Sequence, residues 1–145
     1  MGLVINGTEL ARASKIISNS IFTGGVNIDI KKSTPLRLIF RFFDNNNKLR
    51  CGFTLIEQTN CCGILVSTMT FVHEEFLGNG YAQNMMDLKI LLAKEFGYSL
   101  LLATVDIGNN PAEVHILEKF GWTKVKEFIN ERTKHTLGIY TLNII

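Results

Sequence analysis

The sequence has few of the residues that break or cross-link a chain. Among 145 residues there are only 2 prolines and 3 cysteines, and charged residues make up 19%. Low charge together with 46% apolar residues excludes a disordered protein and indicates one packed domain, which we expect to span residues 1–145. The order of its predicted helices and strands, given below, assigns it to the α+β class. Two of the three cysteines, Cys61 and Cys62, are adjacent, so the sequence suggests reduced thiols rather than a disulfide framework.

Long apolar runs and basic clusters are also missing. No stretch approaches the ~20 continuous apolar residues that cross a bilayer, and the start lacks the pattern of a secretory leader. We therefore expect a cytoplasmic protein without a membrane partner. The net charge is +2 and the basic residues are scattered, so no nucleic-acid partner is expected. The cysteines do not form two pairs at metal-ligand spacing, and we expect no metal.

Apolar periodicity and turn residues predict the secondary structure. A helix begins near Asn6 and ends at Gly24-Gly25, and Asp44–Asn47 forms a hairpin turn between two later strands. The expected strands are Val26–Ile30, Leu36–Phe43, Leu49–Glu57, Gly63–Val72, Ser99–Val105, Thr123–Ile129 and Thr136–Ile144; the other helices are Gly80–Phe96 and one from Asn110-Pro111 to before Gly121. This order predicts a mixed sheet in which a helical crossover makes Gly63–Val72 parallel to Ser99–Val105.

The segment Leu77-Gly78-Asn79-Gly80-Tyr81-Ala82 joins a buried strand to a long helix. Its two glycines allow close approach of a ligand to the backbone, and the first-turn N–H groups favour an anion such as a pyrophosphate. A tight connection without a ligand is the alternative interpretation. The dinucleotide fingerprint would need a third glycine and the P-loop a Gly-Lys-Ser or Gly-Lys-Thr ending, so neither nucleotide-binding fold fits.

Two motifs in order resemble the GCN5-related N-acetyltransferase (GNAT) family. In motif A of this family, a strand that ends in valine is followed by a short connector and then by the pattern Arg or Gln, any two residues, Gly, any one residue, and Gly or Ala. In this sequence Val72 ends the strand and Gly80-Tyr81-Ala82 closes the pattern. Asn110 and Leu117–Trp122 are similar to motif B, an Asn-led helix that ends in an aromatic residue, Glu, Lys and Gly-Phe. The resemblance covers about Gly63 to Val125. It implies a GNAT-like, mostly antiparallel sheet with helices on both faces and splayed central strands.

The resemblance also implies an activity and a co-substrate. The expected activity is an N-acetyltransferase that moves an acetyl or short acyl group from acetyl-CoA to a primary amine of a small molecule or protein by direct attack in a ternary complex. The backbone of Thr70, Phe71 and Val72 would bond the pantetheine arm, and Asn110 would contact the cofactor or merely cap its helix. The pyrophosphate would lie on Leu77, Gly78, Asn79, Gly80, Tyr81 and Ala82. A homodimer is a further implication.

Two positions depart from the family pattern. Leu77 stands where the family usually has Arg or Gln, and Leu117 where it often has a tyrosine that protonates the departing thiolate. A thiolate is a tolerable leaving group, with a pKa near ~8.5, so transfer could survive this loss. Both departures nevertheless favour the alternative function, a catalytically degenerate GNAT-like module that binds CoA or a partner.

An amine acceptor must lose a proton before it attacks, because such amines have a pKa near ~10.4. His73 and Glu74 follow the strand that precedes the glycine segment, and His115 lies on the motif-B helix, so these three are the candidate catalytic bases. The alternative for each of them is an ordinary solvent-exposed residue without a catalytic role. A base acting through ordered water, or an acyl-cysteine route through Cys61-Cys62, is also open.

Overall fold

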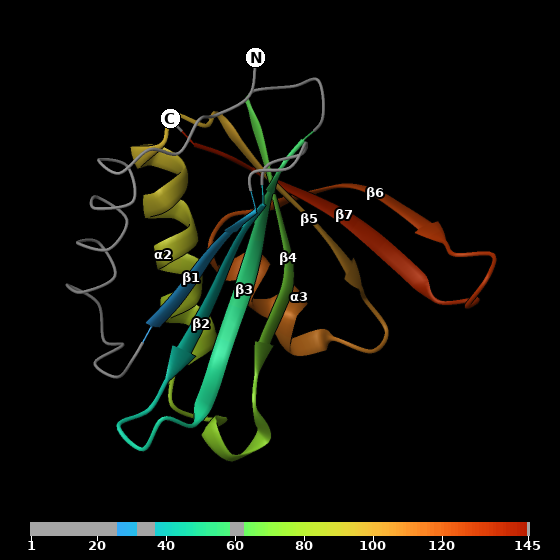
Figure 1. Ribbon diagram of the computed structural model, residues 1–145. Coiled ribbons are helices and arrows are strands. Elements are labelled where there is room, and N and C mark those ends of the chain that lie inside the picture. The colour runs from blue at the N-terminus through green and yellow to red at the C-terminus, as the bar shows by residue number, and fades with distance from the viewer. Residues whose placement is uncertain (1–25, 32–36, 59–62, 145) are drawn as a thin grey trace.

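The computed structural model describes residues 26–31, 37–58 and 63–144. The helix predicted between Asn6 and Gly24, and the pair Cys61-Cys62, lie outside these residues. The described chain forms a seven-stranded sheet with the order β1-β2-β3-β4-β5-β7-β6 (Figure 1). The elements are β1 (Val26–Lys31), β2 (Arg37–Phe43), β3 (Leu49–Glu57), β4 (Ile64–Val72), η1 (Glu74–Phe76), α2 (Tyr81–Glu95), β5 (Leu100–Asp106), α3 (Pro111–Lys119), β6 (Thr123–Ile129) and β7 (Thr136–Asn143).

The sheet is mixed and mostly antiparallel. Five of its neighbouring strand pairs are antiparallel, and β4 and β5 are parallel because the crossover through α2 joins them. The turn at Asp44–Asn47 is formed as expected: Asp44 Oδ1 accepts hydrogen bonds from the backbone N–H of Asn46 at 2.9 Å and of Lys48 at 2.8 Å. The predicted fold class is confirmed.

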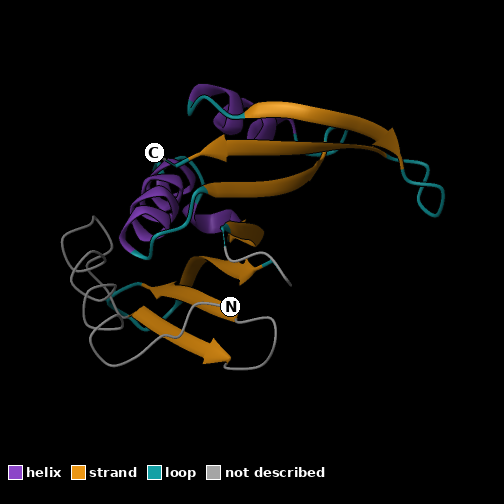
Figure 2. Ribbon diagram, turned by 90° about the horizontal axis from the view of Figure 1, so that it is seen from above, coloured by secondary structure: helices purple, strands orange, loops and turns teal. Residues whose placement is uncertain are grey.

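The parallel pair β4–β5 is short. The two strands pair only from Ile64–Leu100 to Val66–Leu102, although both continue well beyond these residues. Figure 1 shows β4 and β5 diverging towards their carboxyl ends. Figure 2, which views the molecule from above, shows that the strands lie in two separate groups. The central strands are therefore splayed, as the resemblance implied.

The helix α2 packs across β3, β4 and β5, so it covers the region where the sheet splits. Its buried face is mostly apolar and consists of Met85, Met86, Leu88, Lys89, Leu92 and Ala93. The helix α3 lies beside it, since Lys119 Nζ donates to Gln83 Oε1 at 2.9 Å.

The core on the β2–β3 side is built from aromatic rings, with Phe40 stacked on Phe53 at 4.9 Å between ring centroids. Leu117 of α3 is 0% exposed and belongs to the same core. Among the described helices, none is both long enough and apolar enough to cross a bilayer.

Candidate active site between β4 and β5

The divergence of the two central strands leaves an open space that we call the V cleft. It has a volume of about 210 Å³. Its lining comes from β4, from β5 and the start of α3: Ser67, Thr68, Met69, Thr70, Ala103, Thr104, Val105, Asp106, Asn110 and Glu113. Beyond Val66, no strand among the described residues pairs with the edge of β4 that faces β5, so backbone donors and acceptors there are left for a ligand.

A β-bulge shapes the β4 wall of the V cleft. Opposite Phe53 of β3, the strand β4 places two residues, Met69 and Thr70, and the register shifts there. Met69 has a left-handed backbone conformation with φ of 52° and is largely exposed. Bulges redirect the side chains and backbone groups next to them, and this one does so in the middle of the cleft wall.

The amino terminus of α2 follows the carboxyl end of β4, one wall of the V cleft, after η1, and none of its residues is part of the cleft lining. Gly78 and Gly80 both have left-handed backbone conformations, with φ of 82° and 77°, which glycine adopts without strain. Gly80 is the N-cap, and no side chain caps the helix. The first-turn N–H groups therefore remain for an anion. This is the segment in which the sequence predicts the pyrophosphate cradle.

The side chains of the predicted cradle hold its shape rather than fill it. Asn79 Nδ2 donates to the carbonyl of Phe76 at 2.9 Å, and Asn84 Nδ2 donates to the carbonyl of Gly80 at 2.7 Å. Leu77 is 61% exposed, so the residue at the family's Arg or Gln position packs against little of the protein. The Tyr81 hydroxyl accepts a hydrogen bond from Arg50 Nη1 at 3.1 Å.

Asn110 is part of the cleft lining at the start of α3. It is the N-cap residue, but its side chain makes no capping hydrogen bond. Its backbone N–H donates to the carbonyl of Asp106 at 2.9 Å. The alternative in which Asn110 serves only as a helix cap therefore lacks its defining bond, and the side-chain amide lies where a ligand in the cleft could reach it.

A buried lysine lies behind the β4 wall. Lys89 of α2 is 2% exposed, and its Nζ donates to Thr70 Oγ1 at 2.7 Å. Burial lowers the pKa of Lys89 from 10.5 to about 8, while the negative charge of Glu113 opposes this. The sequence did not single out Lys89; the available signal was a lysine on the buried face of an otherwise apolar helix.

Asp106 of the cleft lining forms an ionisable pair with His135, which is itself not part of the lining, and this pair was also not predicted. His135 Nδ1 lies 2.6 Å from Asp106 Oδ2, and Asn109 Nδ2 donates to the same oxygen at 2.9 Å. The hydrogen bond from Asn109, with a smaller contribution from His135, holds the pKa of Asp106 below its ordinary value. A carboxylate that accepts from Nδ1–H leaves Nε2 as the free base of the imidazole. Sequence spacing could not reveal this pair, because 29 positions separate the two residues.

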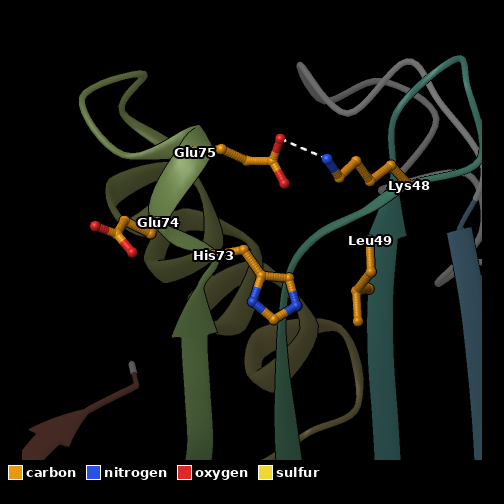
Figure 3. A pocket seen from close by; sticks show the side chains of 5 residues that line it. All are labelled: Lys48, Leu49, His73, Glu74 and Glu75. Atoms are coloured by element: carbon orange, nitrogen blue, oxygen red, sulfur yellow. Dashed lines mark hydrogen bonds and ion pairs between the residues drawn. The ribbon is translucent and has the colours of Figure 1, made fainter.

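The candidate bases His73 and Glu74 do not line the V cleft. They line a separate depression together with Lys48, Leu49 and Glu75, which we call the hairpin-side hollow (Figure 3). It lies at the β3 side of β4, since the His73 N–H donates to the carbonyl of Arg50 at 2.8 Å. Lys48 and Glu75 form an exposed ion pair across it at 2.7 Å.

The third candidate base, His115, is exposed on α3 and is not part of the cleft lining. The structure therefore brings His73 and Glu74 together but places His115 elsewhere. The catalytic roles of all three stay predictions. Among the described residues, no group of three or more potential metal ligands is found.

Comparison with known protein families finds no matching family, and comparison with curated proteins finds no match. Solved structures do match. A spermidine/spermine N-acetyltransferase from Vibrio cholerae, in mutant forms, has a TM-score of 0.61 and 18% identity over 77% of this chain and 68% of its own. The ribosomal-protein-S18-alanine N-acetyltransferase from Escherichia coli has a TM-score of 0.62 and 14% identity over 74% of this chain and 69% of its own.

An acetyltransferase of the GNAT family from Streptococcus pneumoniae is similar to this chain as well, with a TM-score of 0.62 and 16% identity over 77% of this chain and 67% of its own. The chain spans about two thirds of the length of the solved structures that it matches, and 63% of one of them. At these identities the likeness concerns the fold. This chain has the GNAT fold, as the two sequence motifs predicted.

Proposed function

We propose that this chain is a CoA-dependent N-acetyltransferase that transfers an acetyl or similar short acyl group from acetyl-CoA to a primary amine. The observation that carries the proposal is the V cleft: β4 and β5 pair only from Ile64–Leu100 to Val66–Leu102 and then part, and the strand β4 leads, through η1, to the start of α2, which no side chain caps. A flexible arm that carries amide groups and leads to a pyrophosphate suits such a site.

In this proposal acetyl-CoA pairs with the free edge of β4. The backbone of Thr70, Phe71 and Val72 bonds the amides of the pantetheine arm, as an added strand would. The first-turn N–H groups of α2, from Gly80 onwards, hold the pyrophosphate. Asn110 contacts the arm from the opposite wall. Backbone groups supply most of these contacts, so the loss of a side-chain contact at Leu77 weakens binding only modestly.

Transfer then depends mainly on positioning. The thioester carbon lies close to an incoming amine, and a backbone N–H at the bulge polarises its carbonyl. Asp106 lines the cleft and holds His135 by its Nδ1, so in this proposal the Nε2 of His135 is the base for the acceptor amine. In this proposal the base therefore lies on the β5 side of the cleft, whereas the exposed His73 and Glu74 lie on the β3 side of β4.

The cleft lining favours a cationic acceptor. Its charged members are Asp106 and Glu113, both acidic, and no lysine or arginine contributes to it. The matched structures include one that acetylates spermidine or spermine and one that acetylates the alanine of ribosomal protein S18, both amines. We infer that a polyamine-like or amino-terminal amine is the acceptor.

The direct test is CoA release, followed with a thiol reagent, from acetyl-CoA in the presence of spermidine or an alanine-initiated peptide. Amine-dependent release well above the rate without amine is the expected result. If acetyl-CoA binds but neither these nor a wider panel of primary amines stimulates release, the enzyme proposal fails. The chain would then be the degenerate CoA-binding module that Leu77 and the fully buried Leu117 favour.

A further inference from the structure

Lys89 occupies a position that packing alone does not explain. It is 2% exposed on the buried face of α2, between Met85 one turn before it and Leu92 almost one turn after it. An ammonium group is strongly hydrated in water, so its burial among apolar side chains opposes folding. A methionine would fill a similar volume without this cost. The lysine is therefore expected to serve the site next to it.

The hydrogen bond from Lys89 fixes the orientation of a hydroxyl in the V cleft. Lysine is a donor only, so Thr70 Oγ1 accepts at 2.7 Å and its own hydrogen must point elsewhere. Thr70 is part of the cleft lining and lies directly after Met69 in the bulge. The Thr70 O–H is then left to donate to another group, and because Thr70 lines the cleft, a ligand there could accept this bond.

The surroundings of Lys89 keep its charge next to Thr70. Its Nζ lies 5.3 Å from the centroid of the Phe53 ring, on the β3 side. Glu113 on α3 is the facing acidic group, and its charge favours the protonated lysine. With Leu117 buried in the core, α3 offers no tyrosine hydroxyl at that position. Thr70, with the charge of Lys89 behind it, can therefore supply the proton donor that a tyrosine at Leu117 would otherwise provide.

We propose that the Thr70 hydroxyl, oriented by Lys89, donates a hydrogen bond and then a proton to the sulfur of CoA in the V cleft. Thr70 is the catalytic residue in this proposal because it touches the sulfur. Lys89 is a positioning residue that acts through Thr70 and supplies positive charge behind it. The inference rests on the proposed function, and it identifies the group that replaces the tyrosine absent at Leu117.

The step balances as follows. The neutral amine attacks the thioester carbon, so a C–N bond forms and the carbonyl electron pair moves to oxygen. The carbonyl then re-forms, the C–S bond breaks, and its electron pair goes to sulfur. Sulfur takes the proton from Thr70 Oγ1, which in turn takes one from Lys89 Nζ. Solvent in the cleft takes up the proton that the amine nitrogen loses, and one proton returns to Lys89 Nζ by way of the Thr70 hydroxyl, so the products are the amide and CoA thiol.

The test needs no acceptor amine. The full chain is saturated with CoA, and the absorbance of the bound thiolate is followed against pH, with ligand-free protein of the same variant subtracted. Wild type is compared with Lys89→Met, Thr70→Val and Thr70→Ser. Cys51 does not interfere below pH 10, because burial raises the pKa of its thiol to about 11.

In wild type the bound thiol is expected to deprotonate about one pH unit or more below free CoA, since a donor and a nearby cation stabilise the thiolate. Thr70→Val and Lys89→Met should each abolish this shift, and the double variant should do no more than either alone. Thr70→Ser keeps the hydroxyl and should retain it. A merely structural role of Lys89 would not give this pattern.

Two results overturn the inference in distinguishable ways. If CoA binds to all variants and its thiol titrates alike in wild type, Lys89→Met and Thr70→Val, then Lys89 and Thr70 do not act on the sulfur and the proposed function stands. If folded wild type does not bind CoA, both the inference and the proposed function fail.

Discussion

Two depressions flank the carboxyl-terminal half of β4, and they differ in what surrounds them. The hairpin-side hollow is the larger, at about 740 Å³ against about 210 Å³ for the V cleft, and it holds His73, Glu74 and Glu75 in solvent. The V cleft has a strand edge that pairs with no described strand, and a buried lysine lies behind its wall. The strand that forms this wall also leads to a helix start that no side chain caps. Because of this backbone geometry we expect the substrate in the V cleft rather than in the larger hollow with more ionisable side chains.

The largest effect should come from the two histidines on opposite sides of β4. His135→Ala removes the base that Asp106 orients and should lower amine-dependent turnover about 100-fold. His73→Ala, in the hairpin-side hollow, should change it less than about twofold. Initial rates at saturating acetyl-CoA measure both. A larger loss of turnover in His73→Ala than in His135→Ala would instead place the base in the hairpin-side hollow and contradict this comparison.

Replacing the buried lysine should separate stability from function. Below pH 8 Lys89 is charged in both folded and unfolded chains, so the folded state bears the whole cost of burial. Lys89→Met should therefore raise the free energy of unfolding at pH 7, by roughly 1–3 kcal/mol.

The stability difference depends on pH. Between about pH 8 and 10.5 the folded wild type loses the proton of Lys89 while the unfolded chain keeps it. Stability of wild type relative to Lys89→Met should rise through this window and approach that of the variant. Denaturant melts at pH 7 and 10 measure this. A variant less stable than wild type at both values would mean that the lysine is stabilising.

A smaller effect is expected from Asn110. If its amide contacts the pantetheine arm, Asn110→Ala loses one hydrogen bond, worth about 1 kcal/mol, and binds acetyl-CoA about fivefold more weakly. The free energy of unfolding should hardly change, because the side chain makes no capping bond. Calorimetry and a thermal melt give the two quantities. Loss of stability with unchanged affinity would return Asn110 to the role of a cap.

The smallest effect should come from the ion pair across the hairpin-side hollow. Lys48 and Glu75 are more than half exposed, so Glu75→Gln should alter the free energy of unfolding by less than about 0.5 kcal/mol. Its affinity for acetyl-CoA should equal that of wild type. A marked loss of affinity would show that the hollow takes part in binding.

Most of the fold could be predicted from the sequence because its signals are local. The apolar run ending at Val72, the glycines before α2 and Pro111 at the start of α3 each determine the boundary of an element. The parallel placement of β4 and β5 followed from the handedness of crossovers. The bulge at Met69 could not be predicted, because it depends on how β4 pairs with β3.

The site was predictable only in its backbone part. The cradle around Gly80 has a sequence signature, whereas the contact of Lys89 with Thr70 and that of His135 with Asp106 join residues far apart in the chain. The sequence makes His73 a candidate base because it lies near the strand end and carries an imidazole. A residue at a strand end can face either neighbouring strand, and this one lies on the β3 side.

The measurement that tests the central claim most directly is calorimetry of acetyl-CoA binding to wild type, Gly80→Trp and Gly97→Trp. Gly80 and Gly97 lie at opposite ends of α2 with φ of 77° and 79°, and neither has a close neighbour that would block a Cβ. Both substitutions thus cost similar backbone strain, which thermal melts will check. The account predicts micromolar binding by wild type and Gly97→Trp, and at least tenfold weaker binding by folded Gly80→Trp. Equal affinities in all three, or no binding by folded wild type, would contradict it.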